Sequence, residues 1–311
     1  MTVSNTVHNP ARGALYIVVA MLLFACQDVL IKQASDRLPV LQLLAVRTAM
    51  VTGLLMAVIA VVQPRAWRPK RLAPLLLRGV LAFLAFSSYY LALAFIPLAN
   101  ASAVYMSAPL FVTALSVPLL GERIGRHRLI AVVAGFIGVL IVINPGASLF
   151  RVESAVPLFS ALCYALIPII TRRTSSDERA LTMALYTALP YLALTLLAGL
   201  LFSQDTAVAP SSGIAANIRA AWQPLDVELT ATLATTALFF TGGLLSITEA
   251  YRIAAVSALA PFEYSHLVWS ASLGLLVFHE WPTSHTLMGG ALIVACGCYV
   301  GYRENRQRKP T

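Results

Sequence analysis

The sequence predicts an all-α membrane protein in which ten transmembrane helices form two inverted five-helix repeats, with both termini in the cytoplasm. Three observations lead to this prediction. Of the 311 residues, 59% are hydrophobic and only 11% are charged, whereas soluble globular chains carry roughly 25% charged residues. The apolar residues fall into runs of about 20, the length that crosses a hydrocarbon core of roughly 30 Å. The second half of the chain also repeats features of the first.

Polar residues divide the apolar runs into ten predicted spans. These are 14–34, 39–62, 73–96, 98–119 and 127–144, followed by 154–171, 180–202, 228–250, 255–278 and 284–302. Continuous runs of this length favour helices over a barrel, whose strands have about 10 residues of alternating polarity. The predicted organisation is an N-terminal tail (1–13), a first repeat (14–145), a second repeat (154–302) with a long external loop (203–227), and a basic tail (303–311).

The cationic residues predict the orientation, because Lys and Arg are retained on the cytoplasmic side of short loops. One set of helix ends carries most of them: Arg12, Arg65, Arg68, Lys70, Arg71, Arg123, Arg126, Arg128, Arg172, Arg173, Arg179, Arg252, Arg303, Arg306, Arg308 and Lys309. The opposite ends carry only Lys32, Arg37, Arg151 and Arg219. We therefore expect a multi-pass protein of the inner (cytoplasmic) membrane. The net charge of +9 then reflects topology and not nucleic-acid binding.

Self-similarity between the halves predicts the inverted repeat. The run from Ala92 through Tyr105 to Glu122 aligns with the run from Ala250 through Glu263 to Glu280. Because each repeat has an odd number of spans, the second lies upside down relative to the first. Inverted repeats can exchange conformations about a site at their interface, which is typical of transporters. Duplicated bundles also occur in channels and scaffolds, and that alternative stays open.

The same segments resemble a known family. The stretch from Pro109 to Glu122, followed by a basic turn and a Gly-containing span to Asn144, resembles the EamA-type repeat of the drug/metabolite transporter superfamily. The stretch from Pro261 to Gly301 is similar, although it has His279 where the first copy has Gly121. The resemblance covers essentially the whole chain. It implies a metabolite exporter in which spans one, three, four, six, eight and nine surround a central cavity and spans five and ten lie outside it. Aromatic amino-acid exporters are one branch.

Charged residues within the predicted spans are candidate functional residues, because an unpaired charge is costly in hydrocarbon. Asp28 and Arg47 lie roughly 9 and 12 Å from the external ends of their helices at 1.5 Å per residue. At this matching depth they are predicted to form an ion pair, which is either structural or an external gate. Lys32, one turn along the same helix, is an alternative partner for Asp28.

A second candidate pair lies in the ninth predicted span. Glu263 and His266 are three residues apart and share a helix face, and Pro261 can kink the helix in front of them. They could bind a substrate ammonium group or exchange a proton. In the alternative interpretation, His266 is a packing residue and Glu263 pairs with Arg252 or Arg78.

Polar and aromatic residues complete the predicted pocket. They are Ser87, Tyr90, Ser102, Tyr105, Pro109, Tyr164, Phe239, Ser246 and Trp269. Each aromatic residue taken singly is also compatible with helix packing or lipid contact. Together they suit a neutral or zwitterionic solute with an apolar side chain, whereas a sugar nucleotide would need several buried cations.

These features predict an exporter of small metabolites, chiefly aromatic or other apolar amino acids, that works by alternating access. The alternatives are export of other drug-like metabolites by proton antiport, or a membrane receptor or enzyme. The chain has no Gly-x-Ser-x-Gly elbow, His/Glu metal motif or Gly-Lys-Ser/Thr loop. We therefore expect no enzymatic activity, cofactor or metal, and the expected partners are a small-molecule substrate and lipid. Gly289, Gly290, Gly297 and Gly301 could mediate a homodimer or packing within one subunit.

Overall fold

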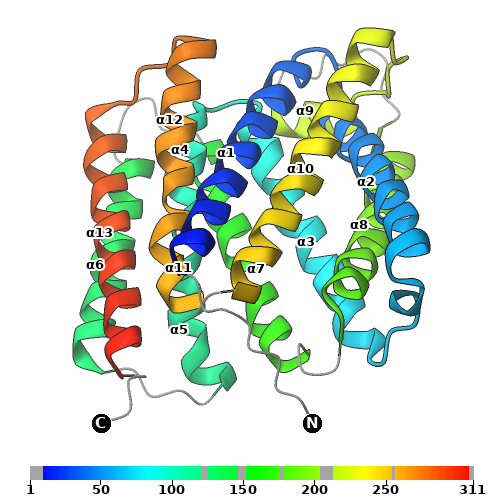
Figure 1. Ribbon diagram of the computed structural model, residues 1–311. Coiled ribbons are helices and arrows are strands. Elements are labelled where there is room, and N and C mark those ends of the chain that lie inside the picture. Colours follow the sequence, from blue (N-terminus) through cyan, green and yellow to red (C-terminus); the bar gives the residue numbers. More distant parts are fainter. Residues whose placement is uncertain are drawn as a thin grey trace.

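The computed structural model describes residues 10–120, 125–145, 152–174, 178–203, 213–253 and 256–307. These residues form helices and no β-strand (Figure 1). The long helices are α1 (Pro10–Ala34), α2 (Val40–Val62), α3 (Leu72–Leu93), α6 (Arg126–Ile143), α7 (Val156–Thr174), α8 (Ala180–Phe202), α10 (Val227–Ile253) and α13 (Ser284–Gln307). The shorter ones are α4 (Leu98–Tyr105), α5 (Ala108–Leu120), α9 (Ile214–Arg219), α11 (Val256–Glu263) and α12 (Ser265–Phe278), with 3₁₀ turns at Pro64–Trp67 and Val152–Ser154.

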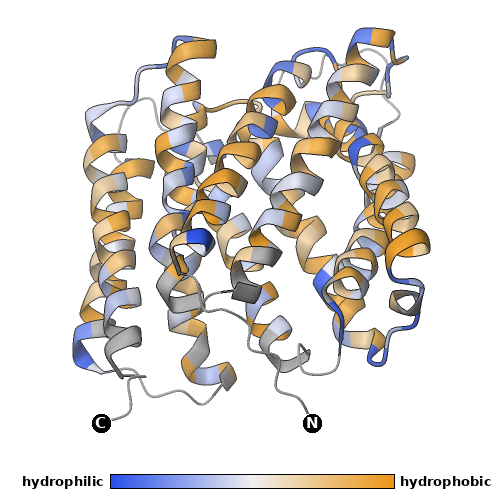
Figure 2. Ribbon diagram, viewed as in Figure 1, coloured by the Kyte–Doolittle hydropathy of each residue, from blue (hydrophilic) through white to orange (hydrophobic). Residues whose placement is uncertain are grey.

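Several of these helices have the length and composition of membrane spans. Within the described ranges, 7 segments qualify: Ala11–Ala34, Val40–Val62, Leu72–Leu93, Leu98–Leu115, Leu181–Phe202, Val227–Ile247 and Ser284–Tyr302. Two further apolar helices, Leu129–Ile143 and Val156–Thr171, are shorter. Outward faces carry exposed apolar side chains such as Leu200 and Leu276. Hydrophobic residues predominate along the helices between the two ends of the bundle (Figure 2). Such faces fit a hydrocarbon surrounding, in which every helix satisfies its own backbone hydrogen bonds.

Helices lie at each predicted span, but two spans are interrupted. The segment 98–119 is divided into α4 and α5, and the segment 255–278 is divided into α11 and α12. At the first break, Pro109 has no backbone N–H, and its ring would clash with the carbonyl of Tyr105, the last residue of α4. Pro261 likewise lies within α11, ahead of the break at Tyr264. Pro109 therefore explains the first interruption through the carbonyl four residues before it, whereas the second lies after Pro261 and is not explained in this way.

The helices form one bundle in which α1 begins and α13 ends at the same end (Figure 1). We call this the terminal end, and we call the opposite end, with the connections 35–39 and 279–283, the distal end. Helix α1 packs on α10, α3 packs on α7 and α8, and α2 packs on α8. Helices α6 and α13 pack side by side at one edge of the bundle (Figure 1).

Glycine permits close helix contact at this edge. A Cβ atom on Gly289 would lie 2.5 Å from the carbonyl oxygen of Gly138 in α6, and one on Gly297 would lie 1.7 Å from Tyr264 Oη. Gly289 and Gly297 therefore serve packing inside the subunit, the second of the two roles considered for them.

The largest cluster of buried apolar side chains lies at the distal end. It joins the end of α1, the start of α2, the end of α3 and the starts of α4 and α10, through residues such as Ile31, Leu43, Leu93, Leu98 and Leu233. Close packing of this kind leaves few voids larger than a water molecule. The distal end is therefore sealed, which determines where a cavity can open.

Candidate functional site: a central cavity

A cavity of about 270 Å³ lies in the middle of the bundle. Its described walls come from α1, α2, α3, α4, α5, α7, α8, α10, α11 and α12, whereas α6 and α13 contribute no lining residue. The resemblance implied that the fifth and tenth spans lie outside the cavity, and these helices occupy that place. The resemblance did not place α2 and α8 around the cavity, yet α2 supplies Arg47 and α8 supplies Tyr191 to its lining.

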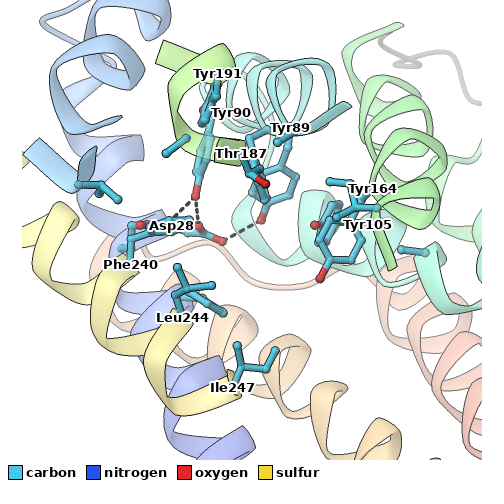
Figure 3. A pocket seen from close by; sticks show the side chains of 18 of the residues that line it. Asp28, Tyr89, Tyr90, Tyr105, Tyr164, Thr187, Tyr191, Phe240, Leu244 and Ile247 are labelled. Carbon is cyan, nitrogen blue, oxygen red and sulfur yellow. Dashed lines mark hydrogen bonds between the residues drawn. The ribbon is translucent and has the colours of Figure 1, made fainter. Parts of the chain in front are cut away.

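The cavity extends from the centre toward the terminal end. On α1 its lining residues are Met21, Phe24, Gln27 and Asp28, and none lies beyond Asp28 toward the distal end. On α10, which runs in the opposite direction, they are Phe240 at the middle of the helix and Leu244 and Ile247 in the half nearer the terminal end (Figure 3). The cavity is therefore directed to one face of the bundle.

Eight of the predicted site residues line this cavity: Asp28, Arg47, Tyr90, Tyr105, Pro109, Tyr164, Glu263 and His266. Ser87, Ser102, Phe239, Ser246 and Trp269 are not among its lining residues. On α10 the stripe that faces the cavity has helical spacing through 240, 244 and 247, so Phe239 and Ser246 lie on neighbouring faces. Trp269 instead packs in a cluster with Ile17 and Leu259.

Asp28 is buried and held by its neighbours. Tyr89 Oη and Tyr90 Oη each donate a hydrogen bond of 2.9 Å to its carboxylate (Figure 3). His266 Nε2 lies 3.3 Å from Oδ2, and Gln27 Nε2 donates to Tyr90 Oη. A buried carboxylate is costly unless it is hydrogen-bonded. Donors from α3 and α12 satisfy this one.

Arg47 is only 1% exposed and has few partners. Its guanidinium carbon lies 5.2 Å from the ring centroid of Tyr90 and 5.1 Å from that of Phe240. Nη2 donates to Tyr191 Oη at 3.2 Å, while Nε and Nη1 have no hydrogen-bond partner among the described residues. Arg47 is thus a buried cation with free donors beside the cavity.

Asp28 and Arg47 do not form the direct ion pair that their matching depth predicted. Tyr90 links them instead, with its hydroxyl on Asp28 and its ring against Arg47. A gate in which the two charges meet remains a prediction about another conformation.

Lys32, the predicted alternative partner of Asp28, pairs elsewhere. Its Nζ donates to Glu280 Oε1 at 2.5 Å and to the carbonyl of Ile96 at 2.9 Å. Glu280 Oε2 accepts a hydrogen bond of 3.0 Å from the backbone N–H of Leu98, the first residue of α4. A carboxylate is favourable at a helix N-terminus, whose free N–H groups carry partial positive charge. These contacts, which we call the distal tie, join α1, α4 and the end of α12.

A second set of ion pairs lies outside the spans at the same end. Arg37 contacts Asp226 at 2.5 Å and Glu228 at 3.2 Å. The hydrogen bond to Asp226 raises the pKa of Arg37. The backbone N–H of Leu229 and, after it, Arg37 lower the pKa of Asp226. Both side chains are about half exposed, so these pairs add little stability.

Arg78 and Glu263 also line the cavity. Arg78 Nε and Nη1 have no hydrogen-bond partner in the described part of the chain. The alternative pairing of Glu263 with Arg252 lies outside the residues whose side chains are described. The break at Tyr264 places Glu263 and His266 on different helices, yet both reach the same cavity.

Aromatic rings form a connected wall. The ring centroids of Tyr89 and Tyr105 are 5.0 Å apart, and those of Tyr105 and Tyr164 are 5.4 Å apart. Phe86 contacts Tyr191 and Phe240 at 6.1 and 6.4 Å. Distances of this size allow edge-to-face and offset contacts, which a planar ligand could join.

Sequence reasoning missed several of these residues, notably Tyr89, Tyr191, Phe86 and Phe240. One signal on α3 was available, because Arg78, Ala82, Phe86 and the Tyr89-Tyr90 pair recur at helical spacing and would form one stripe. No comparable signal in the sequence distinguishes Phe240 from Phe239.

The helical membrane fold and its largely apolar, aromatic-lined cavity with a few charged groups define the class: a multi-pass membrane protein with a central site for small molecules. Comparison with known proteins identifies the family. Residues 11–144 match the model of the EamA-like transporter family. The S-adenosylmethionine uptake transporter of Rickettsia bellii is 30% identical over 237 residues, which cover 74% of this chain and 73% of that protein. The chain therefore belongs to the EamA-like transporter family, within the drug/metabolite transporter superfamily, and is a membrane transporter.

Other relatives span almost the full length. The riboflavin transporter of Vibrio cholerae is 28% identical over 307 residues, 97% of each chain. The pseudopaline exporter CntI of Pseudomonas aeruginosa is 29% identical over 287 residues, 91% of this chain and 94% of that one. A solved crystal structure with 19% identity superposes with a TM-score of 0.60 over 96% of this chain and 99% of the other, which supports the fold alone.

Proposed function

We propose that this protein exports small neutral or zwitterionic solutes with an apolar or aromatic side chain, such as aromatic amino acids, across the inner membrane by alternating access. The cavity is the observation that carries the proposal. It combines a wall of tyrosine and phenylalanine rings with a few charged groups, Arg47 and Asp28 among them. Its volume of about 270 Å³ lies just below the range of roughly 300–1,000 Å³ for drug-sized ligands, which favours a small solute.

The helix contacts support two inverted five-helix repeats, in which α1, α2 and α3 correspond to α7, α8 and α10. Helix α1 packs on α10 as α7 packs on α3, and α2 packs on α10 as α8 packs on α3. The short helices α4 and α11 each have 8 residues and are each followed by a break. A pseudo-two-fold axis between the repeats would produce this pattern. Such an axis would give ten spans, counting α4–α5 and α11–α12 as one each.

Export is favoured by the side on which the cavity lies. The terminal end carries most of the cationic residues, which the positive-inside rule assigns to the cytoplasm. The cavity extends toward this end, and the distal tie and apolar cluster close the other. In this conformation the site is therefore directed toward cytosolic solutes. The relatives' names include both uptake and export, so the family alone does not decide the direction.

The test is transport by the purified full-length protein in proteoliposomes. We expect saturable, protein-dependent counterflow of radiolabelled phenylalanine. Phe240→Ala should reduce it by roughly tenfold, because an aromatic contact contributes up to about 1.5 kcal/mol. The matched control is Phe202→Ala, since Phe202 is 54% exposed and outside the cavity. If the correctly folded protein transports no amino acid, the proposal is refuted.

A proton-coupled version is a second candidate, favoured by the contact between Asp28 and His266. The titratable and charged groups that interact with Asp28 are Cys26 from α1, Arg47 from α2, Tyr89 and Tyr90 from α3, Tyr105 from α4 and His266 from α12. If Asp28 carries the proton, Asp28→Asn abolishes transport driven by a pH gradient and preserves counterflow. Glu263→Gln is measured for comparison. If only Glu263→Gln reduces transport driven by the pH gradient, the proton is carried by Glu263 and not by Asp28.

A further inference from the structure

We infer that the transported solute carries a carboxylate and that Arg47 is the residue that binds it, an inference that rests on the proposed function. Arg47 is the most deeply buried cation that lines the described cavity, at 1% exposure. A guanidinium has five N–H donors, of which one makes a hydrogen bond here, to Tyr191. Nε and Nη1 make none among the described side chains.

A buried charge without an ionic partner is costly, and in membrane proteins it marks a functional position. Arg47 has no carboxylate within ion-pair distance among the described residues, because Asp28 is directed to Tyr89, Tyr90 and His266. The missing partner is then a ligand group. A planar guanidinium matches the geometry of a carboxylate, which accepts two N–H bonds at once.

The surroundings hold the guanidinium in place without consuming its donors. The rings of Tyr90 and Phe240 lie against it at 5.2 and 5.1 Å, and cation–π attraction acts through their faces. Both rings line the cavity (Figure 3). A substrate carboxylate on Arg47 would therefore place the rest of the molecule beside Phe240 and the tyrosine wall, where an aromatic ring can stack.

Asp28 is a poor site for the substrate's ammonium group, because three donors already surround its carboxylate. The carboxylate of the solute should accordingly matter more than its amino group. Arg78 is the rival anchor. It lies on α3 about 18 Å along the helix axis from Tyr90, toward the terminal end, and it interacts with Tyr164 of the aromatic wall.

The experiment compares four ligands on the wild-type protein in proteoliposomes: phenylalanine, phenylalaninamide, 3-phenylpropionate and phenethylamine. Competition against radiolabelled phenylalanine should rank phenylalanine and 3-phenylpropionate far above the two compounds without a carboxylate, by about 100-fold, since a site built for a polar group rejects analogues that lack it. Equal competition by the acid and its amide would overturn the inference while leaving the proposed function intact. Failure to transport phenylalanine or any other amino acid would instead refute the proposed function, and with it the assignment of Arg47 as the anchor.

Variants locate the anchor. Arg47→Gln should weaken the binding of phenylalanine and 3-phenylpropionate by about 100-fold. It should change the binding of phenylalaninamide by less than about threefold. Arg47→Lys should restore part of the acid preference, since it keeps the charge and loses the planar fork. Arg37→Gln, an exposed arginine outside the cavity, is the control. Loss of the acid preference in Arg78→Gln but not in Arg47→Gln would assign the site to Arg78 and overturn the inference. If the Arg47 variants do not fold, Arg78→Gln decides between the two cations: an unchanged acid preference in that variant supports Arg47, and its loss overturns the inference.

Discussion

Replacing Glu280 by Gln should open the distal end of the cavity. Glu280 accepts one hydrogen bond from Lys32 and one from the N–H of Leu98, and the two side chains of its ion pair are only 26% and 11% exposed. A hydrogen bond to a charged group contributes about 1.5–3 kcal/mol, and partial exposure lowers this value. Under the proposed alternating access, a loss of about 2 kcal/mol from the closed form would shift the equilibrium toward a form open at the distal end by roughly 30-fold.

Thiol labelling measures this shift. Ser102 is 0% exposed and lies about one helical turn along α4 from Leu98 of the distal tie, so Ser102→Cys in a background without the native cysteines should react slowly with a membrane-impermeant reagent added at the distal side. Adding Glu280→Gln should accelerate labelling by roughly 30-fold, whereas Arg37→Gln, which breaks two exposed ion pairs, should change it little. The reversed pair Lys32→Glu with Glu280→Lys should restore closure only in part, because a cation at the start of α4 is unfavourable. Unchanged labelling in Glu280→Gln would refute the reasoning.

Two further predictions concern packing and pH. Gly297→Ala should destabilise the protein by about 1–3 kcal/mol, because the added Cβ would lie 1.7 Å from Tyr264 Oη. Thermal unfolding measures this loss, and Gly53→Ala is the control because a Cβ there would have nothing within 4 Å. Equal destabilisation by the two substitutions would contradict the prediction. Asp226 has a lowered pKa in the folded protein, so its stabilising contribution is present above its ordinary value of 3.8 and is lost as pH falls through the folded value. Unfolding measured over pH 2–6 should show a shallower acid dependence in Asp226→Asn, and an identical profile would argue against this contribution.

Much of the architecture followed from local composition. The apolar runs predicted the helical class and the segments in which helices lie, because a lipid surrounding admits only segments that satisfy their own backbone. Pro261 predicted a disturbance in its span, and an interruption follows it. The break after Tyr105 was not predicted, because Pro109 was considered only as a residue of the pocket. Pro109 acts through the backbone on the residue four positions before it, so its effect can be read without knowing the neighbours.

The contacts of the charged residues were less predictable. Equal depth suggested a pair between Asp28 and Arg47, but depth does not specify the direction in which a side chain points. A helix turns by about 100° per residue, so an error of one position exchanges a cavity face for a packed one. Phe240 lines the cavity and Phe239 does not for this reason.

The sequence by itself determined that this chain is a helical membrane protein, and it restricted the functional candidates to a few buried polar and aromatic residues. Only the tertiary structure decided which of these meet: Lys32 with Glu280, Asp28 with Tyr89 and Tyr90, and Arg47 with two rings and two free donors. The physical reason is that spans and hydrophobicity are properties of one segment. Contacts between residues far apart in the chain depend on the rotation and packing of every helix between them.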